Sequence, residues 1–169
     1  NIMSFDDFLI KGEEKIVIDL RLSLHKKDIL SVMRNAYDNS AIFKAMLDKW
    51  FDAGKLITIK YFEGSFGASR EYEVLFLDLK VISESMYIDN NGTAVKSTLD
   101  MALLQELVHH LMDVADNTDL IESGKTPDYR QPAVTIANTI YRELGIPEQN
   151  AYLAHDGEGN ILSLGHQYT

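Results

Sequence analysis

The sequence predicts an α+β domain in which a small, mostly antiparallel sheet is followed by two helices. Near the N-terminus, every second residue is apolar, which is typical of a strand. Two short segments with helical spacing follow. Segments rich in β-branched and aromatic residues then precede two further stretches with helical spacing. Strands and helices grouped in this way, instead of alternating regularly, are typical of the α+β class. The length of 169 residues fits one domain, which we expect to span 1–169.

Composition excludes several classes of protein. Hydrophobic residues make up 46% and charged residues 25%, as in packed globular domains. The net charge of −10, without any run of Lys or Arg, argues against nucleic acid as a partner because binding to phosphates requires positive charge. No apolar run approaches the ~20 residues that cross a bilayer, so we expect no membrane partner.

The chain contains no cysteine, which excludes disulfides, thiolate zinc sites and a cysteine nucleophile. A cysteine-free acidic chain is compatible with the cytosol and with export alike. Because the first residue is Asn1, we expect a processed product or a piece of a longer protein. The sequence carries no signal for an oligomeric state.

The N-terminal half is expected to contain a strand, two helices and three more strands. Alternating apolar residues predict a strand over 15–25. Helical spacing over 26–51 predicts two short helices, the second capped by Ser40 and ended by Gly54. Segments rich in Ile, Val, Tyr and Phe predict a meander of three strands at 55–62, 70–78 and 80–89.

The C-terminal half is expected to contain two helices and a hairpin. Ser97 or Thr98 caps a helix that runs to about Asp116, and Pro132 and Gly145 bracket the second helix. The acidic, glycine-containing segment 156–160 lacks the spacing of an EF-hand loop, so we interpret it as a turn before a short strand at 161–164.

The helix after Thr98 has an apolar half and a polar half, and the polar half carries Gln105, Glu106, His109, His110, Asp113 and Asp116. An ordinary amphipathic helix with a solvated face explains this pattern. However, Gln105-Glu106-Leu107-Val108-His109 differs at one position from His-Glu-x-x-His, in which two imidazoles one turn apart hold Zn²⁺ beside a general base. Gln105 and His109 are therefore candidate metal ligands, and Glu106 is the candidate catalytic base.

A second segment extends this match. Residues 137–147, Ala-Asn-Thr-Ile-Tyr-Arg-Glu-Leu-Gly-Ile-Pro, resemble the pattern Glu-Asn-x-Ile-Arg-x-Glu-Leu-Gly-x-Pro of a secreted-effector zinc metallopeptidase family of pathogenic bacteria. Residues 104–111 are similar to its Leu-x-His-Glu-Leu-x-His-Ala-Leu helix. The resemblance covers about 87–152 and implies a zincin-like fold, a zinc cofactor and a peptide or protein substrate. It also implies that the metal polarises the scissile carbonyl, that Glu106 takes the proton of the bound water, and that the peptide adds to an edge strand near Tyr87.

Two positions depart from the family pattern. Gln105 stands where the first histidine is expected, and a carboxamide is a far poorer zinc ligand than an imidazole. Ala137 stands where the family has an acidic residue. We therefore expect zinc binding to be weak or absent, with little or no peptidase activity. The acids that can substitute are Asp113, Asp116 and Glu143.

Two alternatives remain open, so the sequence does not decide whether the chain is an enzyme. It can be a non-catalytic module that binds protein through the remnant cleft or a sheet edge, or an active metallopeptidase that carries a substitution at Gln105. Tyr152 and His155 are candidate oxyanion donors, although a partly buried aromatic residue and a turn residue are simpler interpretations. His110 is expected to form a surface contact with Glu106. His25 and His166 have no partner that the sequence can assign.

Overall fold

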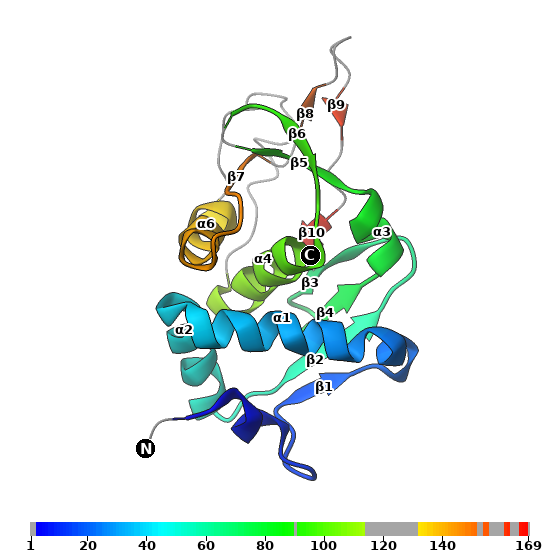
Figure 1. Ribbon diagram of the computed structural model, residues 1–169. Helices are drawn as coiled ribbons and strands as arrows, with labels where there is room; N and C mark the ends of the chain where they lie inside the picture. Colours follow the sequence, from blue (N-terminus) through cyan, green and yellow to red (C-terminus); the bar gives the residue numbers. More distant parts are fainter. Residues whose placement is uncertain are drawn as a thin grey trace.

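The computed structural model describes residues 3–89, 91–113 and 132–151, together with the strands β8 (Ala154–His155), β9 (Ile161–Leu162) and β10 (His166–Tyr168). The main sheet has the strand order β1-β2-β4-β3-β10, where β1 is Ile16–Ile18, β2 is Ile57–Tyr61, β3 is Phe66–Ser69 and β4 is Val74–Leu77. In the view of Figure 1, the helices α1 (Lys26–Asn39) and α4 (Leu99–Met112) lie in front of this sheet.

The direction of the strands in the main sheet differs from the prediction. Three of its pairings are parallel, β1 with β2, β2 with β4 and β10 with β3, and only β3 with β4 is antiparallel. The predicted meander and the mostly antiparallel main sheet are therefore wrong. Residue periodicity indicates which segments are strands, but the neighbours of a strand depend on the path of the connecting chain. Here α1 and the helix α2 (Ala41–Asp52) carry the chain from β1 across to β2.

The first predicted strand is only partly correct. It ends at Ile18, and the remaining residues form a 3-10 helix, η2 (Leu20–His25). Asp19 begins this helix because its carboxylate accepts a hydrogen bond of 3.0 Å from the Arg21 amide. Leu20 and Leu24, which continue the alternation, expose 86% and 91% of their surface, so they contribute nothing to the core.

Both helices predicted for 26–51 are present as α1 and α2, and Ser40 separates them. The Ser40 hydroxyl accepts a hydrogen bond of 3.1 Å from the Phe43 amide, as the capping prediction requires. Gly54 follows α2 with φ of 77°, in the left-handed region that favours glycine. The buried faces of the two helices meet, and the core residues they contribute are Ile29, Met33, Ala36, Tyr37, Phe43, Met46, Leu47 and Phe51.

The strand predicted for 80–89 is correct only in its second half. A short helix, α3 (Leu79–Glu84), comes first because the Asp78 side chain accepts a hydrogen bond of 3.1 Å from the Lys80 amide. The strand β5 (Met86–Asp89) then pairs antiparallel with β6 (Ala94–Lys96) on one side and with β7 (Gln149–Ala151) on the other. This second sheet lies above α4 in Figure 1.

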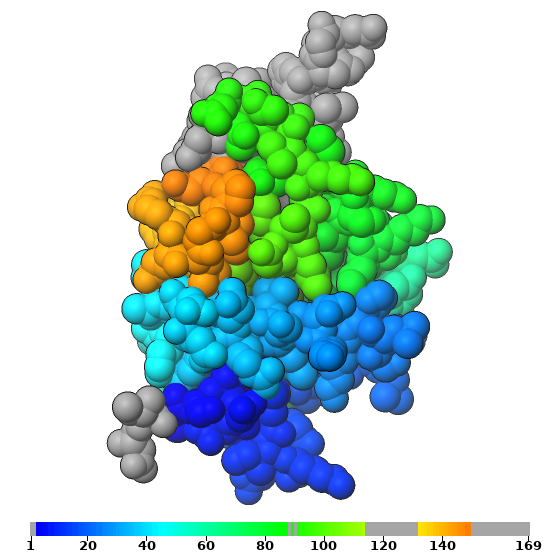
Figure 2. Space-filling model, in the orientation of Figure 1, coloured from blue at the N-terminus to red at the C-terminus, as the bar shows by residue number. Residues whose placement is uncertain are grey.

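Helix α4 is the central element of the fold. It packs against β3 and β4 of the main sheet and against α1, α2, α3 and the helix α6 (Pro132–Leu144). The predicted start and end of α6 are confirmed, with Gly145 at φ of 71° directly after it. Figure 2 shows α1 and α2 as a continuous band across this face of the molecule, with the end of α6 packed against it. Among the described residues, no helix has the length and apolar composition needed to cross a bilayer.

Candidate functional site

The polar half of α4 is buried, which corrects the expectation of a solvated helix face. Glu106 and His109 are 0% exposed, Gln105 is 3% exposed and His110 is 8% exposed. The reason is the position of α4, which has protein on all sides, whereas a surface helix would have kept this half in water. Burial of polar groups is costly unless they have partners, so these four side chains need a structural or functional explanation.

Glu106, the candidate catalytic base, lies where solvent does not reach either of its carboxylate oxygens. Its neighbour across the α4–α6 interface is Tyr141, whose hydroxyl donates a hydrogen bond of 2.7 Å to the Met101 carbonyl oxygen. Burial raises the pKa of Tyr141 well above its usual value, and the charge of Glu106 raises that pKa further.

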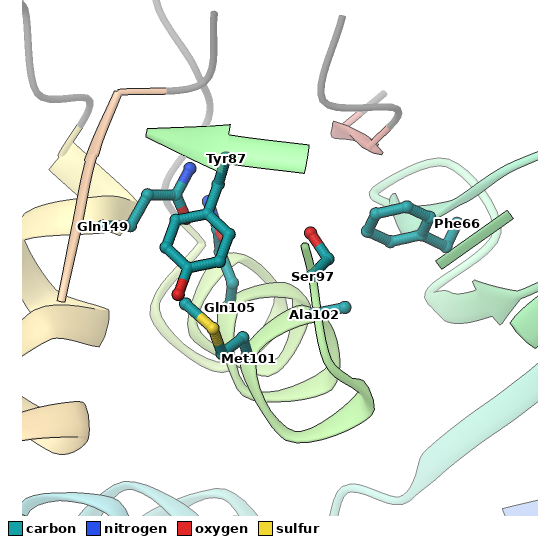
Figure 3. A pocket seen from close by; sticks show the side chains of 7 residues that line it. All are labelled: Phe66, Tyr87, Ser97, Met101, Ala102, Gln105 and Gln149. Atoms are coloured by element: carbon teal, nitrogen blue, oxygen red, sulfur yellow. The ribbon is translucent and has the colours of Figure 1, made fainter. Parts of the chain in front are cut away.

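Gln105, one of the two candidate metal ligands, lines a small cavity between α4 and the second sheet. The cavity is lined by Phe66, Tyr87, Ser97, Met101, Ala102, Gln105 and Gln149. Figure 3 shows the Tyr87 ring pointing from β5 towards α4, with Gln105 behind it and Gln149 at its side. About 10 Å³ is open to the centre of a water molecule, which is the room for one water. Gln105 thus faces a hollow beside the strand that ends at Asp89, as expected, whereas His109 is not among the lining residues.

The wall of this cavity opposite α4 is held by a pair of hydrogen bonds that the sequence did not predict. The Asn138 side chain donates to the Gln149 carbonyl oxygen at 2.6 Å and accepts from the Gln149 amide at 2.8 Å. The pair fixes β7 to α6 and places Gln149 at the cavity. The one signal in the sequence is an asparagine in the interior of a helix, which is unfavourable unless its side chain has a partner.

The acids considered as substitute ligands have other structural roles. Both carboxylate oxygens of Glu143 bond to the start of α2, accepting from the Ser40 hydroxyl at 2.9 Å and from the Ala41 and Ile42 amides at 3.3 Å. Asp113 ends α4 with φ of 51° and pairs with Arg70 at 2.8 Å, its side chain 76% exposed. Asp116 lies outside the described residues.

Among the described residues, the positions that correspond to the family's metal ligands offer few donor atoms for zinc. Ala137, at the position of the expected acidic ligand, is fully buried and offers only a methyl group. In the described part of the chain, no three residues among His, Asp and Glu form a group that could hold a metal. A structural or catalytic zinc site requires at least three such protein ligands. At the three described positions that the resemblance points to, the possible donors are the Gln105 carboxamide and the His109 imidazole.

His110 does not form the predicted surface contact with Glu106, because both side chains are buried. Its ring instead packs against Trp50 of α2, with ring centroids 4.9 Å apart. Within the described residues, Nε2 of His110 has no hydrogen-bond partner. Burial lowers the pKa of His110 below its usual value, since the charged imidazolium would lose its hydration.

The remaining predictions for this region have different outcomes. Tyr87 lies on β5, the central strand of the second sheet, and the outer strands β6 and β7 flank it. Addition of a peptide to an edge strand near Tyr87 therefore stays a prediction. Tyr152, the turn 156–160 and the side chains of His155 and His166 lie outside the described residues. Strands β8 and β9 on either side of that turn pair antiparallel. His25 stands at the start of α1 and makes no capping hydrogen bond with its side chain.

The sequence matches no protein-family model and no curated protein sequence. The fold is similar to that of the Salmonella zinc metalloprotease effector GtgA, with a TM-score of 0.60 over 80% of this chain and 72% of that chain. The two sequences are 18% identical. The resemblance inferred from the two sequence segments is thus supported at the level of the fold, which is mixed α+β.

Proposed function

We propose that this chain is a zincin-like domain with a degenerate metal site, little or no peptidase activity, and a peptide or protein as its partner. The observation that carries the proposal is the burial of the Gln105-Glu106-x-x-His109 turn of α4. Glu106 and His109 are 0% exposed, and among the described residues Gln105 lines a cavity of about 10 Å³. A peptidase needs room for a substrate carbonyl and a water molecule beside its base, whereas the Glu106 side chain is fully buried.

The donor set supports the same conclusion. Loss of the first imidazole at Gln105 removes one ligand, and the methyl group of Ala137 replaces a second. The substitute acids Glu143 and Asp113 bond to the start of α2 and to Arg70. Because His109 is the one imidazole at the described positions of the motif, we expect zinc affinity too low for a resident ion.

The test is the zinc content of the purified chain and of designed variants after dialysis against zinc-containing and then zinc-free buffer. We expect substoichiometric zinc in the unaltered chain and a clear gain in Gln105→His/Ala137→Glu. Cobalt substitution gives an independent readout, because a tetrahedral site containing imidazoles produces visible absorption without any peptidase activity. The thermal unfolding temperature with and without zinc gives a second independent readout, because an ion that binds only the folded state stabilises that state.

A matched control uses the other buried glutamine of the same cavity. Gln149 is 3% exposed, like Gln105, but lies on β7 instead of α4. Gln149→His adds an imidazole to the same cavity without restoring the one-turn spacing, so we expect no gain of zinc. Stoichiometric zinc in the unaltered chain, or an equal gain in Gln149→His, would contradict the proposal.

A second candidate function is a non-catalytic module that binds protein. It is favoured by large apolar side chains that remain exposed on the described surface, among them Tyr72 at 72% and Phe62 at 59%. Such residues mark interaction surfaces when they gather in one region. This candidate predicts that Glu106→Gln leaves partner binding unchanged, whereas substitutions at the exposed residues weaken it.

The third candidate is an active metallopeptidase whose first ligand has been substituted at Gln105. It predicts that Gln105→His alone restores both zinc and hydrolysis of an unfolded protein substrate. Because Ala137 also lacks a donor atom, we expect the single variant to remain inactive, so recovered hydrolysis would favour this candidate over the degenerate site.

A further inference from the structure

A groove of about 410 Å³ lies away from the α4 site, along β2, the start of β4 and the end of α2. Its lining consists of Trp50, Lys55, Leu56, Thr58, Lys60, Tyr72, Glu73 and Val74. The volume is within the range of roughly 300–1,000 Å³ that ligand sites occupy. No residue is shared with the cavity at Gln105, so this inference is independent of the proposed metal-site degeneration.

The groove lies on the face of the main sheet that turns away from the helices. Ile57 and Ile59 of β2 are 0% exposed and point into the core, so the alternating Thr58 and Lys60 point to the opposite face. On the neighbouring strand β1, Val17 pairs with Thr58 and is 45% exposed. The sheet therefore presents an uncovered face at β1 and β2, with the groove at its α2 end.

Two lysines give this groove a cationic character. The described salt bridges neutralise Arg21, Arg34, Lys44, Arg70 and Arg142. Lys55 and Lys60 are exposed and take part in no ion pair within the described residues. In a chain of net charge −10, two such ammonium groups in one concave site favour an anionic ligand.

Aromatic side chains give the groove a fixed apolar wall. The Trp50 indole donates a hydrogen bond of 3.0 Å to the Leu56 carbonyl oxygen, and the Lys55 ammonium lies 4.5 Å from its ring centroid. The His110 ring packs against the same indole. Tyr72 and Leu56 are 72% and 49% exposed. A ligand that covers Tyr72 and Leu56 would bury apolar surface. The Trp50 ring is already held by its hydrogen bond, so binding would not cost the entropy of ordering it.

Glu73 determines which class of anion fits. It is a non-glycine residue with φ of 52°, a strained conformation that places a carboxylate in the same groove as the two lysines. The phosphodiester backbone of a nucleic acid carries a charge on every unit and only hydrogen-bond acceptors, so it offers the Glu73 carboxylate no donor. A peptide backbone offers N–H groups, from which the Glu73 carboxylate and the Thr58 hydroxyl can accept hydrogen bonds.

We propose that this groove binds a short acidic peptide segment. Carboxylates of the peptide pair with Lys55 and Lys60, an aliphatic or aromatic side chain of the peptide covers Leu56 and Tyr72, and Glu73 accepts a backbone N–H. The occupant is thus a protein segment that combines Asp or Glu with large apolar residues.

The chain contains one tryptophan, so the emission of Trp50 reports directly on this groove. The probe is the blocked hexapeptide acetyl-Glu-Leu-Asp-Glu-Leu-Asp-amide, titrated into the full chain. We expect a saturable change in Trp50 emission and at least a tenfold weaker affinity in high salt, because exposed charge pairs are screened. A peptide with Lys at the four acidic positions, and hexathymidylate, should bind at least tenfold more weakly.

Charge-reversal variants locate the binding. Lys55→Glu/Lys60→Glu should weaken binding of the acidic peptide at least tenfold. Lys26→Glu/Lys27→Glu, on the exposed start of α1, changes the net charge equally and should leave the affinity within a factor of about two. Tyr72→Ala, a variant at an exposed position that keeps every charge, should weaken binding as well. Far-UV circular dichroism verifies that each variant folds.

Three results would overturn the proposal. They are the absence of saturable binding of the acidic peptide, equal weakening by the two double variants, and hexathymidylate binding as tightly as the peptide. The second result would mean that only overall charge matters, and the third would assign the groove to a nucleic acid.

Discussion

The Tyr141 hydroxyl donates a hydrogen bond of 2.7 Å to the carbonyl oxygen of Met101, joining α6 to the first turn of α4. Both residues are buried, so this bond lies inside the interface between the two helices. It is one of the contacts that hold the helix carrying the motif residues in the core.

Tyr141→Phe should lower the free energy of unfolding by about 1 kcal/mol, the typical net contribution of one buried hydrogen bond. Urea unfolding followed by circular dichroism measures it. Tyr72→Phe is the control, because Tyr72 is 72% exposed and its change should have no effect. Equal stability of Tyr141→Phe and the unaltered chain would mean that the bond contributes nothing.

Glu143→Gln should destabilise the fold by about 1 kcal/mol, because its negative charge complements the start of α2 and accepts from two of its amides. Zinc content should stay unchanged, since Glu143 serves the helix and not a metal. Glu84→Gln, at an exposed position of α3, is the control. A change in metal binding in Glu143→Gln without loss of stability would instead return this acid to the metal site.

Stability should fall as the pH is lowered from about 6.5, the ordinary histidine value. Burial lowers the pKa of His110 in the folded state, so the unfolded chain binds more protons across this interval and gains free energy relative to the folded chain. Each tenfold difference in proton affinity contributes about 1.4 kcal/mol. Urea titrations at several pH values, followed by Trp50 emission, measure the slope.

His110→Gln should flatten this pH dependence, whereas His25→Gln, at the start of α1, should leave it unchanged. Because the His110 ring packs 4.9 Å from Trp50, His110→Gln should also alter the emission of the folded protein. An unchanged slope in His110→Gln would assign the pH dependence to other groups.

Ala137→Glu by itself should destabilise the fold by about 3 kcal/mol or more, because it places a charge and extra volume at a position that is 0% exposed. Thr135→Glu, at an exposed position of the same helix, should change stability by less than about 1 kcal/mol. Zinc should restore part of the lost stability only when Gln105→His is also present. Restoration by zinc in Ala137→Glu alone would show that Gln105 is not the limiting position.

The sequence by itself determined the elements that follow from local chemistry. Ser40 as a cap, Gly54 and Gly145 as helix ends, and the span of α6 all depend on contacts within a few residues, so their local spacing identified them. The placement of Gln105 and His109 one turn apart on a helix followed from their spacing of four residues. The order of the predicted strands and helices also indicated the mixed α+β class that the structure has.

Only the tertiary structure decided which strands are parallel and that the polar half of α4 is buried. Both depend on residues far apart in the chain: the parallel pairing of Ile16 with Ile57 follows from the path through α1 and α2, and the burial of Glu106 follows from packing against α6 and the sheet. Periodicity reports how a residue relates to its own helix or strand, and it carries no information on what covers the other face. The same limit explains why the helical spacing of Trp50 does not reveal that its ring lines the groove along β2.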